Sequence, residues 1–308
     1  MSAHLIHIGY AKAGSTFLKR WFESHPEIAY SKHGIAGFAD IHDISKQAAD
    51  PSGGVRLRVS SSEALATPSP WAGGIPDYLS DRQRADGSES DRACRELAAV
   101  FPGASVLLVT RGFKSMMLSS YSQYVRTGGS AEFFAAAPDF GSTDGTRHAW
   151  NYDRLIETYR ASFGDRLIVL PYELLRDDPQ RFADLLSERF GLSRHPVPKK
   201  RLNLSLSPVE LRWYPRLARP LLWLPLGASL RRCFLSIHAR IAYRNLLRLP
   251  IRLLHWIRPL EPLNESMISE DVLKTLSGKA TLLRSLPLHA AYAEEYLFNM
   301  DGVVHPRD

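Results

Sequence analysis

The chain has 308 residues, which suits one large α/β domain or one domain with a sizeable insertion. Its composition, 44% hydrophobic and 23% charged, is that of an ordinary soluble globular protein. Its only cysteines, Cys94 and Cys233, are far apart, which argues against a disulfide framework or a zinc site and predicts a reducing cytoplasmic location. The net charge is +7, no secretory signal is visible, and no apolar run reaches the ~18 residues of a membrane span.

Strand and helix patterns alternate along the first two thirds of the chain. Residues 4–9 predict a buried strand, and residues 15–24 have the apolar spacing of a helix packed on a sheet. Further strands are expected at residues 55–60, 105–110 and 167–172, and further helices from residue 61, at 91–101, at 148–163 and after residue 178. This alternation predicts a central parallel sheet flanked by helices on both faces.

The remaining segments break this alternation. Residues 67–90 and 127–147 are rich in Gly, Ser, Pro and charged residues and predict a surface excursion and a mobile loop. We expect one domain over residues 1–308, in which an α/β core (1–204) is followed by an arginine-rich helical insertion (205–260) and C-terminal helices (261–308).

A phosphate-binding turn is predicted after the first strand. Gly9 and Gly14 have the spacing of a Walker A loop, but Ser15 stands where the loop lysine would be, and the lysine comes earlier, at Lys12. A strand that ends in a glycine turn before a helix directs backbone N–H groups toward the positive end of the helix dipole. The alternative for Lys12 is an ordinary solvated turn lysine.

The strand at residues 105–110 is followed by Arg111, where a nucleoside triphosphatase would place an aspartate that helps to hold Mg²⁺. An arginine cannot coordinate a cation, whereas its planar fork suits a phosphate. Arg111 therefore argues against a metal-dependent kinase, although an isolated arginine here would commonly be a surface residue.

Three motifs resemble the sulfotransferases that use 3′-phosphoadenosine 5′-phosphosulfate (PAPS). Residues 10–16, YAKAGST, are similar to the family's YPKSGTT loop, and Arg111 with Ser119 eight residues later resembles its arginine–serine pair. Residues 172–179, YELLRDDP, look like its YEDLxxDP segment. The resemblance covers roughly residues 4–200 and implies the P-loop-like sulfotransferase fold.

The resemblance also implies roles for individual residues. The loop at Ala13, Gly14, Ser15 and Thr16 would bind the 5′-phosphosulfate, and Arg111 with Ser119 would bind the 3′-phosphate. Two aromatic residues would lie near the adenine: Tyr172, and Phe17 in place of the aromatic that stacks on the base. Residues 199–205 loosely resemble a segment near the 3′-phosphate, which makes Arg201 and Asn203 weaker candidates beside a solvated basic loop.

Lys12 suits the chemistry of sulfuryl transfer, because an ammonium group stabilises the charge that develops on the leaving oxygen without any metal. The acceptor hydroxyl needs a base. His33 stands where glycan-type members often have a glutamate, and Glu63 is the second candidate, although each has an ordinary structural explanation. Asp40, His42 and Asp43 are weaker candidates.

The charge is concentrated in one segment. Residues 211–260 contain ten arginines and no Asp, Glu or Lys. Arg240, Arg244 and Arg248 recur every four residues and predict a basic amphipathic helix that stops at Pro250 and resumes toward Arg258. This helix could contact an anionic membrane through residues 211–258, line a cleft for an acidic acceptor, or pack as an ordinary helix. Nucleic acid is not expected, because no stacking aromatic platform accompanies the arginines.

The chain is therefore predicted to transfer a sulfuryl group from PAPS to a hydroxyl of a carbohydrate or glycolipid, leaving the product PAP, without a metal. It is expected in the cytoplasm, with a contact at the inner membrane face. The alternatives are a P-loop kinase-like phosphotransferase and a non-catalytic nucleotide-binding membrane adaptor.

Overall fold

A five-stranded parallel sheet forms the centre of the protein, as a computed structural model shows for residues 3–30, 54–63, 65–66, 88–133, 150–198, 205–222 and 227–299. The strands are β1 (Ala3–Gly9), β2 (Ile28–Tyr30), β3 (Leu57–Ser61), β4 (Ser105–Thr110) and β5 (Leu167–Pro171), and their order in the sheet is β2-β3-β1-β4-β5. Each neighbouring pair is parallel. The predicted parallel α/β architecture is confirmed.

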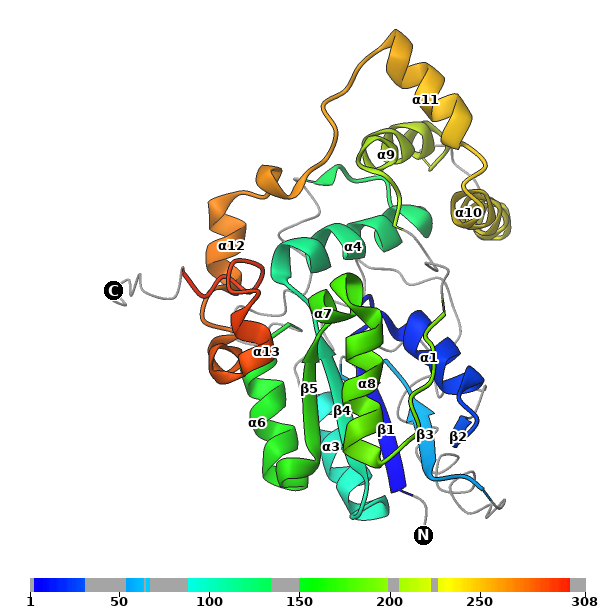
Figure 1. Ribbon diagram of the computed structural model, residues 1–308. Helices are drawn as coiled ribbons and strands as arrows, with labels where there is room; N and C mark the ends of the chain where they lie inside the picture. The colour runs from blue at the N-terminus through cyan, green and yellow to red at the C-terminus, as the bar shows by residue number, and fades with distance from the viewer. Residues whose placement is uncertain are drawn as a thin grey trace.

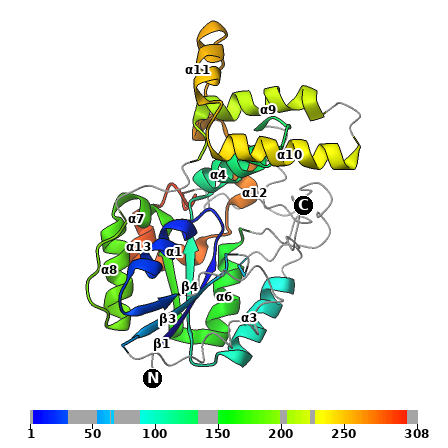
Figure 2. The ribbon, with the colours of Figure 1, turned by 90° about the vertical axis from the view of Figure 1, so that its right-hand side faces the viewer.

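Helices cover both faces of the sheet (Figures 1 and 2). The views place α1 (Ser15–Ser24), α7 (Tyr172–Asp177) and α8 (Pro179–Phe190) on one face, and α3 (Ser88–Val100) and α6 (Tyr152–Phe163) on the other. The middle strands are buried from both sides, which explains why β4 is an unbroken apolar run rather than an alternating one. The large core side chains of α1, Leu18, Trp21 and Phe22, lie against this sheet.

The strand order creates a switch point at the carboxyl ends of β1 and β4. After β1 the chain runs through α1 to β2 and β3 on one side, whereas β4 and β5 lie on the other side of β1. In open parallel sheets, ligands bind in the crevice at such a point. The helix α4 (Phe113–Arg126) begins there, directly after β4.

The segment after β3 differs from its prediction. Ser61 is the last residue of the strand and Glu63 lies in a turn, so residues 61–63 do not begin a helix. The backbone N–H groups of Ser62 and Ala66 donate to the carbonyls of His7 and Ile8 in β1, at 2.9 Å each. These bonds keep the chain alongside β1 and away from a helical path.

The arginine-rich segment forms three helices, α9 (Pro208–Leu222), α10 (Ala228–Tyr243) and α11 (Arg248–Ile257), beyond α4 at the carboxyl end of the sheet (Figure 1). The predicted continuous helix through Arg240, Arg244 and Arg248 is wrong. The break falls at residues 244–247, where Asn245 has a φ of 53°. Pro250 lies in the first turn of α11, where a missing N–H costs no helical hydrogen bond, so it does not stop the helix.

The C-terminal region contains shorter helices than expected: η4 (Glu265–Met267), α12 (Glu270–Leu276), η5 (Thr281–Ser285) and α13 (Pro287–Ala290). Residues 291–299 form turns. Tyr296, Leu297 and Phe298 are all buried. Because an α-helix turns by roughly 100° per residue, three consecutive side chains cannot all lie on one narrow buried stripe, which explains why the helix prediction fails here.

Candidate functional site

The glycine turn between β1 and α1 has the backbone conformation of an anion nest. Lys12 and Gly14 have φ values of 67° and 87°. Ser15 and Thr16 form the first turn of α1, where the backbone N–H groups are directed toward the positive end of the helix dipole. The Ser15 hydroxyl donates to the carbonyl of Tyr10 at 3.4 Å, which ties the turn together.

Gly14 is required by space as well as by conformation. A Cβ at this position would lie 2.4 Å from Cδ2 of Leu175 and 3.3 Å from the ring of Tyr172. The turn therefore packs directly on α7, where the YELLRDDP motif begins. Two motifs separated by about 160 residues of sequence meet at this contact, since residue 14 touches residues 172 and 175.

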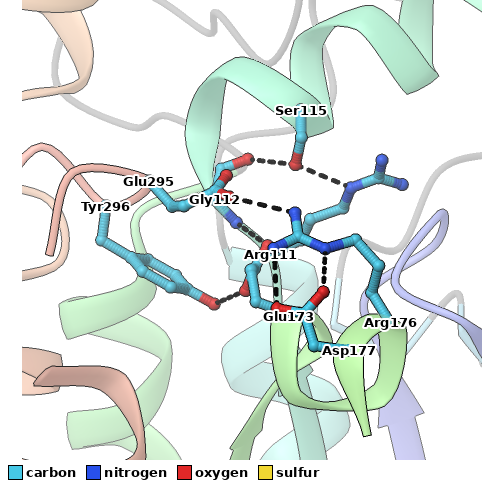
Figure 3. Close-up of polar contacts among 8 residues, drawn as sticks. All are labelled: Arg111, Gly112, Ser115, Glu173, Arg176, Asp177, Glu295 and Tyr296. Atoms are coloured by element: carbon cyan, nitrogen blue, oxygen red, sulfur yellow. Dashed lines mark hydrogen bonds and ion pairs between the residues drawn. The ribbon is translucent and has the colours of Figure 1, made fainter. Parts of the chain in front are cut away.

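Arg111, at the end of β4, joins the same site. Its Nη1 donates to the carbonyl of Lys12 at 2.5 Å. Its Nε donates to the Ser115 hydroxyl at 3.0 Å, as Figure 3 shows. Its guanidinium carbon lies 4.4 Å from the centre of the Tyr172 ring, in cation–π geometry. The three motifs of the sequence therefore converge on one place at the switch point of the sheet.

The helix α4 presents a polar face to this site. Ser115, Ser119, Gln123 and Arg126 follow each other at helical spacing, and Gln123 accepts a hydrogen bond from Lys12 Nζ at 3.3 Å. Ser119 is buried, one turn beyond the serine that Arg111 contacts. The sequence analysis singled out Ser119 but missed Ser115, Gln123 and Arg126. Because α4 carries further polar residues at other positions, their shared spacing was only a weak signal in the sequence.

The site has a strongly positive character. The pKa of Lys12 is lowered to about 8, first by burial and then by repulsion from Arg126 and Arg111, while Glu63 partly offsets this effect. Burial also lowers the pKa of Arg126. Three cationic side chains thus surround a partly enclosed turn, an arrangement that costs free energy until an anion enters.

A buried carboxylate supports the turn that carries Arg111. Glu173 is completely buried and accepts hydrogen bonds from the Gly112 backbone N–H at 2.9 Å and from the Tyr296 hydroxyl at 2.8 Å (Figure 3). Burial raises its pKa. The Tyr296 hydroxyl also lies 2.9 Å from the hydroxyl of Thr110. Glu173 was part of a predicted motif, but its function here is to anchor the β4–α4 turn against the C-terminal segment.

Three further residues that were predicted to bind PAPS lie in or next to the turn, and two are not described by the structure. Ala13 is buried inside it, and Phe17 is partly buried on α1. Thr16 lies at the edge of a groove between α1 and residues 195–198. Arg201 and Asn203 fall outside the residues that the structure describes.

Of the two candidate bases, the structure describes Glu63. It follows β3 at the carboxyl edge of the sheet, near enough to Lys12 to affect its pKa, and its carboxylate lies 3.6 Å from Lys19 Nζ. His33 and the weaker candidates Asp40, His42 and Asp43 lie outside the described residues. Within the described ranges, no group of three or more His, Cys, Asp or Glu side chains could hold a metal ion.

Comparison with known proteins supports the fold through structure alone. No protein-family model matches the chain, and no curated protein matches it by sequence. A sulfotransferase from Alicyclobacillus acidocaldarius matches with a TM-score of 0.50 and 16% identity, over 71% of this chain and 92% of that chain. Mouse sulfotransferase SULT7A1, solved with PAP, matches with a TM-score of 0.41 and 14% identity, over 64% of this chain and 61% of that chain. The first match shows that the chain has the sulfotransferase fold, as the motif resemblance implied.

Proposed function

We propose that this protein transfers a sulfuryl group from PAPS to a hydroxyl group. The observation that carries the proposal is the contact between Arg111 and the Lys12 carbonyl, because it brings a candidate phosphate-binding arginine and a candidate leaving-group lysine into one site. The sulfotransferase fold and the order of the three motifs support the same conclusion.

The residues fit a nucleotide with phosphate groups at two positions. The amides of Gly14, Ser15 and Thr16 would bind the 5′-phosphosulfate, with no Cβ on Gly14 to obstruct the approach of α7. Arg111 and Ser119 would bind the 3′-phosphate. The excess of cationic side chains at the turn matches the charge of such a donor.

Tyr172 and Phe17 would contact the adenine. The Tyr172 ring stacks against the guanidinium of Arg111, which supports a position of the adenine close to the proposed 3′-phosphate site. Phe17 is partly buried on the first helix of the loop motif. Ala13 contributes to the loop, and Arg201 and Asn203 remain proposals on sequence grounds.

Lys12 would stabilise the leaving group. In the transfer, the bond between sulfur and the bridging phosphate oxygen breaks while a bond between sulfur and the acceptor oxygen forms. Negative charge develops on the bridging oxygen, and the Lys12 ammonium beside it lowers the barrier. Gln123 orients Lys12 through its 3.3 Å hydrogen bond.

A base must take the proton of the acceptor hydroxyl. Glu63 is placed at the carboxyl edge of the sheet and interacts electrostatically with Lys12. His33 is the other candidate. If Glu63→Ala and His33→Ala both kept full activity, neither residue would be the base.

On the acceptor side, we propose a hydroxyl of a carbohydrate or glycolipid, with the protein in the cytoplasm and in contact with the inner membrane face through residues 211–258. Arg111 occupies the strand end where a kinase would need its Mg²⁺-binding aspartate, which disfavours a phosphotransferase.

The test is transfer from sulfur-labelled PAPS to a panel of glycan and glycolipid acceptors, with ATP and Mg²⁺ as the competing donor. We expect transfer from PAPS only, and a loss of 10²–10³-fold in kcat for Lys12→Ala. Lys279→Ala, which removes another partly buried lysine, is the matched control and should retain activity. Turnover that needs ATP, or full activity of Lys12→Ala, would refute the proposal.

A further inference from the structure

In the part of the chain that the structure describes, the exposed large hydrophobic side chains gather in one region. Within the described residues, every large hydrophobic side chain that is exposed lies between residues 230 and 257. They are Leu230, Ile237, Tyr243, Leu246, Leu249, Leu253, Leu254, Trp256 and Ile257. Trp256 is 80% exposed and Leu249 is 75% exposed. Exposed apolar side chains gathered in this way are typical of an interaction surface.

The apolar stripe of helix α11 faces away from the rest of the protein. Its one buried residue is Ile251, which faces the protein. At 3.6 residues per turn, Leu249, Leu253 and Trp256 lie roughly 140–160° around the helix from Ile251. The stripe that a surface helix normally buries therefore points away from the protein.

Arginines flank this stripe. Arg248 and Arg252 lie between the apolar side of α11 and its buried side, and Arg258 follows the helix. Across the described part of the chain, no carboxylate forms an ion pair with any of these three arginines. No acidic residue occurs anywhere in residues 211–260.

The position of α11 connects this surface to the donor site. Both ribbon views show α11 at the end of the molecule beyond α4, projecting farther from the sheet than any other described helix (Figures 1 and 2). The preceding helix, α10, ends at Tyr243, whose hydroxyl accepts a hydrogen bond from Gln123. Gln123 also contacts Lys12. The apolar and basic surface is thus connected to the proposed leaving-group lysine through two side chains, Tyr243 and Gln123.

We infer that α11 docks on the surface of an anionic lipid bilayer, with Leu249, Leu253 and Trp256 inserted at the boundary between the headgroups and the acyl chains. Resting on the proposed sulfuryl transfer, the inference also places the acceptor hydroxyl on a lipid headgroup that reaches the site past Tyr243. The ten residues of α11 span about 15 Å, which suits a helix lying in the interface. In the described chain, no helix combines the length and apolar character needed to cross a bilayer.

The arginines of this surface favour an anionic bilayer over a second copy of this chain as its partner. In a symmetric dimer the same patch would face itself, so the unpaired arginines of one copy would meet those of the other. Anionic headgroups neutralise these arginines while the acyl region takes the apolar stripe. A lipid surface satisfies both features at once.

The experiment is flotation of the full chain with vesicles of phosphatidylcholine alone or mixed equally with phosphatidylglycerol. We expect binding to the anionic vesicles only, weakened by salt. The variant Arg248→Gln/Arg252→Gln should bind about 25-fold more weakly, at roughly fivefold for each arginine. The variant Leu253→Ser/Trp256→Ser should bind at least tenfold more weakly.

The matched control is Arg95→Gln/Arg160→Gln, which removes the same charge from exposed positions on α3 and α6 and should bind like the wild type. Thermal unfolding checks that each variant is folded. Equal loss in the control, equal binding to neutral vesicles, or no vesicle binding together with dimers that Trp256→Ser disrupts would overturn the inference.

Calorimetry with PAP on the same preparations separates this inference from the proposed function. PAP binding that is unchanged in the α11 variants supports a role in docking alone. Vesicle binding without PAP binding would remove the sulfuryl-transfer proposal and the acceptor assignment while leaving the docking surface intact. PAP binding without vesicle binding would remove the docking surface alone.

Discussion

Lys12 combines two unfavourable features that an anion would relieve. It is a non-glycine residue in a left-handed conformation, with a φ of 67°, and its ammonium group lies near Arg111 and Arg126. A turn selected only for stability would contain glycine at such a φ and no partly buried cation. Unfavourable local features of this kind are typical of functional sites.

Replacing the charge should therefore stabilise the ligand-free protein. We expect Lys12→Met to raise the free energy of unfolding by on the order of 2 kcal/mol at neutral pH, since the pKa of Lys12 falls from 10.5 to about 8 on folding. Between these two pH values the unfolded wild type binds more protons than the folded one, so its stability rises with pH. The advantage of the variant should be greatest below about pH 8 and disappear by about pH 10.5.

Urea unfolding of the two proteins across this pH range measures the effect. PAP should stabilise the wild type more than Lys12→Met, because the phosphate interaction is lost in the variant. A variant that is less stable than the wild type at neutral pH would show that the ammonium group is not electrostatically strained.

Gly14 permits a second residue-level prediction with a matched control. Gly14→Ala places a methyl group 2.4 Å from Leu175, whereas Gly191→Ala, also at a positive φ of 63°, meets nothing within 4 Å. Both should lose about 1 kcal/mol through backbone strain. We expect Gly14→Ala to lose more than this and to weaken PAP binding at least tenfold, measured by thermal unfolding and calorimetry. Equal behaviour of the two variants would contradict the tight packing of the turn on α7.

Among the secondary-structure elements, the β4–α4 turn depends on a contact from the other end of the chain. Glu173 on α7 accepts from Gly112 in the turn and from Tyr296 near the C-terminus, and the Glu295 carbonyl accepts from the Phe113 backbone N–H at 2.9 Å. The start of α4, and with it Arg111, is therefore positioned by two segments that are distant in sequence, α7 and residues 295–296.

Removing Glu173 should loosen this connection. We expect Glu173→Ala to cost about 2–4 kcal/mol of stability, because it leaves a buried N–H and a buried hydroxyl without their acceptor. PAP binding should weaken as the Arg111 turn becomes less ordered. Glu173→Gln keeps an oxygen for Gly112 and should retain more of both. Glu188→Ala, an exposed carboxylate on α8, is the control, and similar losses for it and Glu173→Ala would argue against the anchoring role.

At the scale of the whole molecule, the sequence patterns predicted correctly the longer strands and the helix α1, whose positions depend mainly on the local order of apolar residues. Apolar runs placed the strands, and β4 and α1 match their predicted bounds at both ends. The glycine turn and Arg111 were predicted because each belongs to a short sequence motif. The structure shows that Arg111 contacts the turn through the Lys12 carbonyl.

Two of the failures have a tertiary origin. Residues 61–63 continue along β1 because of hydrogen bonds to β1 that no local pattern reveals. The segment around Tyr296 is held by a hydrogen bond to Glu173, which is distant in sequence. The break between α10 and α11 has a local cause instead, an asparagine at positive φ. Gln123 and Arg126 were missed because their role depends on where α4 crosses the turn.

The most direct test of the donor assignment is calorimetry with PAP and 5′-AMP on the wild type and on Arg111→Gln. These ligands differ in the 3′-phosphate, which Arg111 and Ser119 would bind. We predict that the wild type binds PAP at least 100-fold more tightly, about 2.7 kcal/mol, and that Arg111→Gln loses most of this preference. Equal affinity of the wild type for PAP and 5′-AMP would contradict the account.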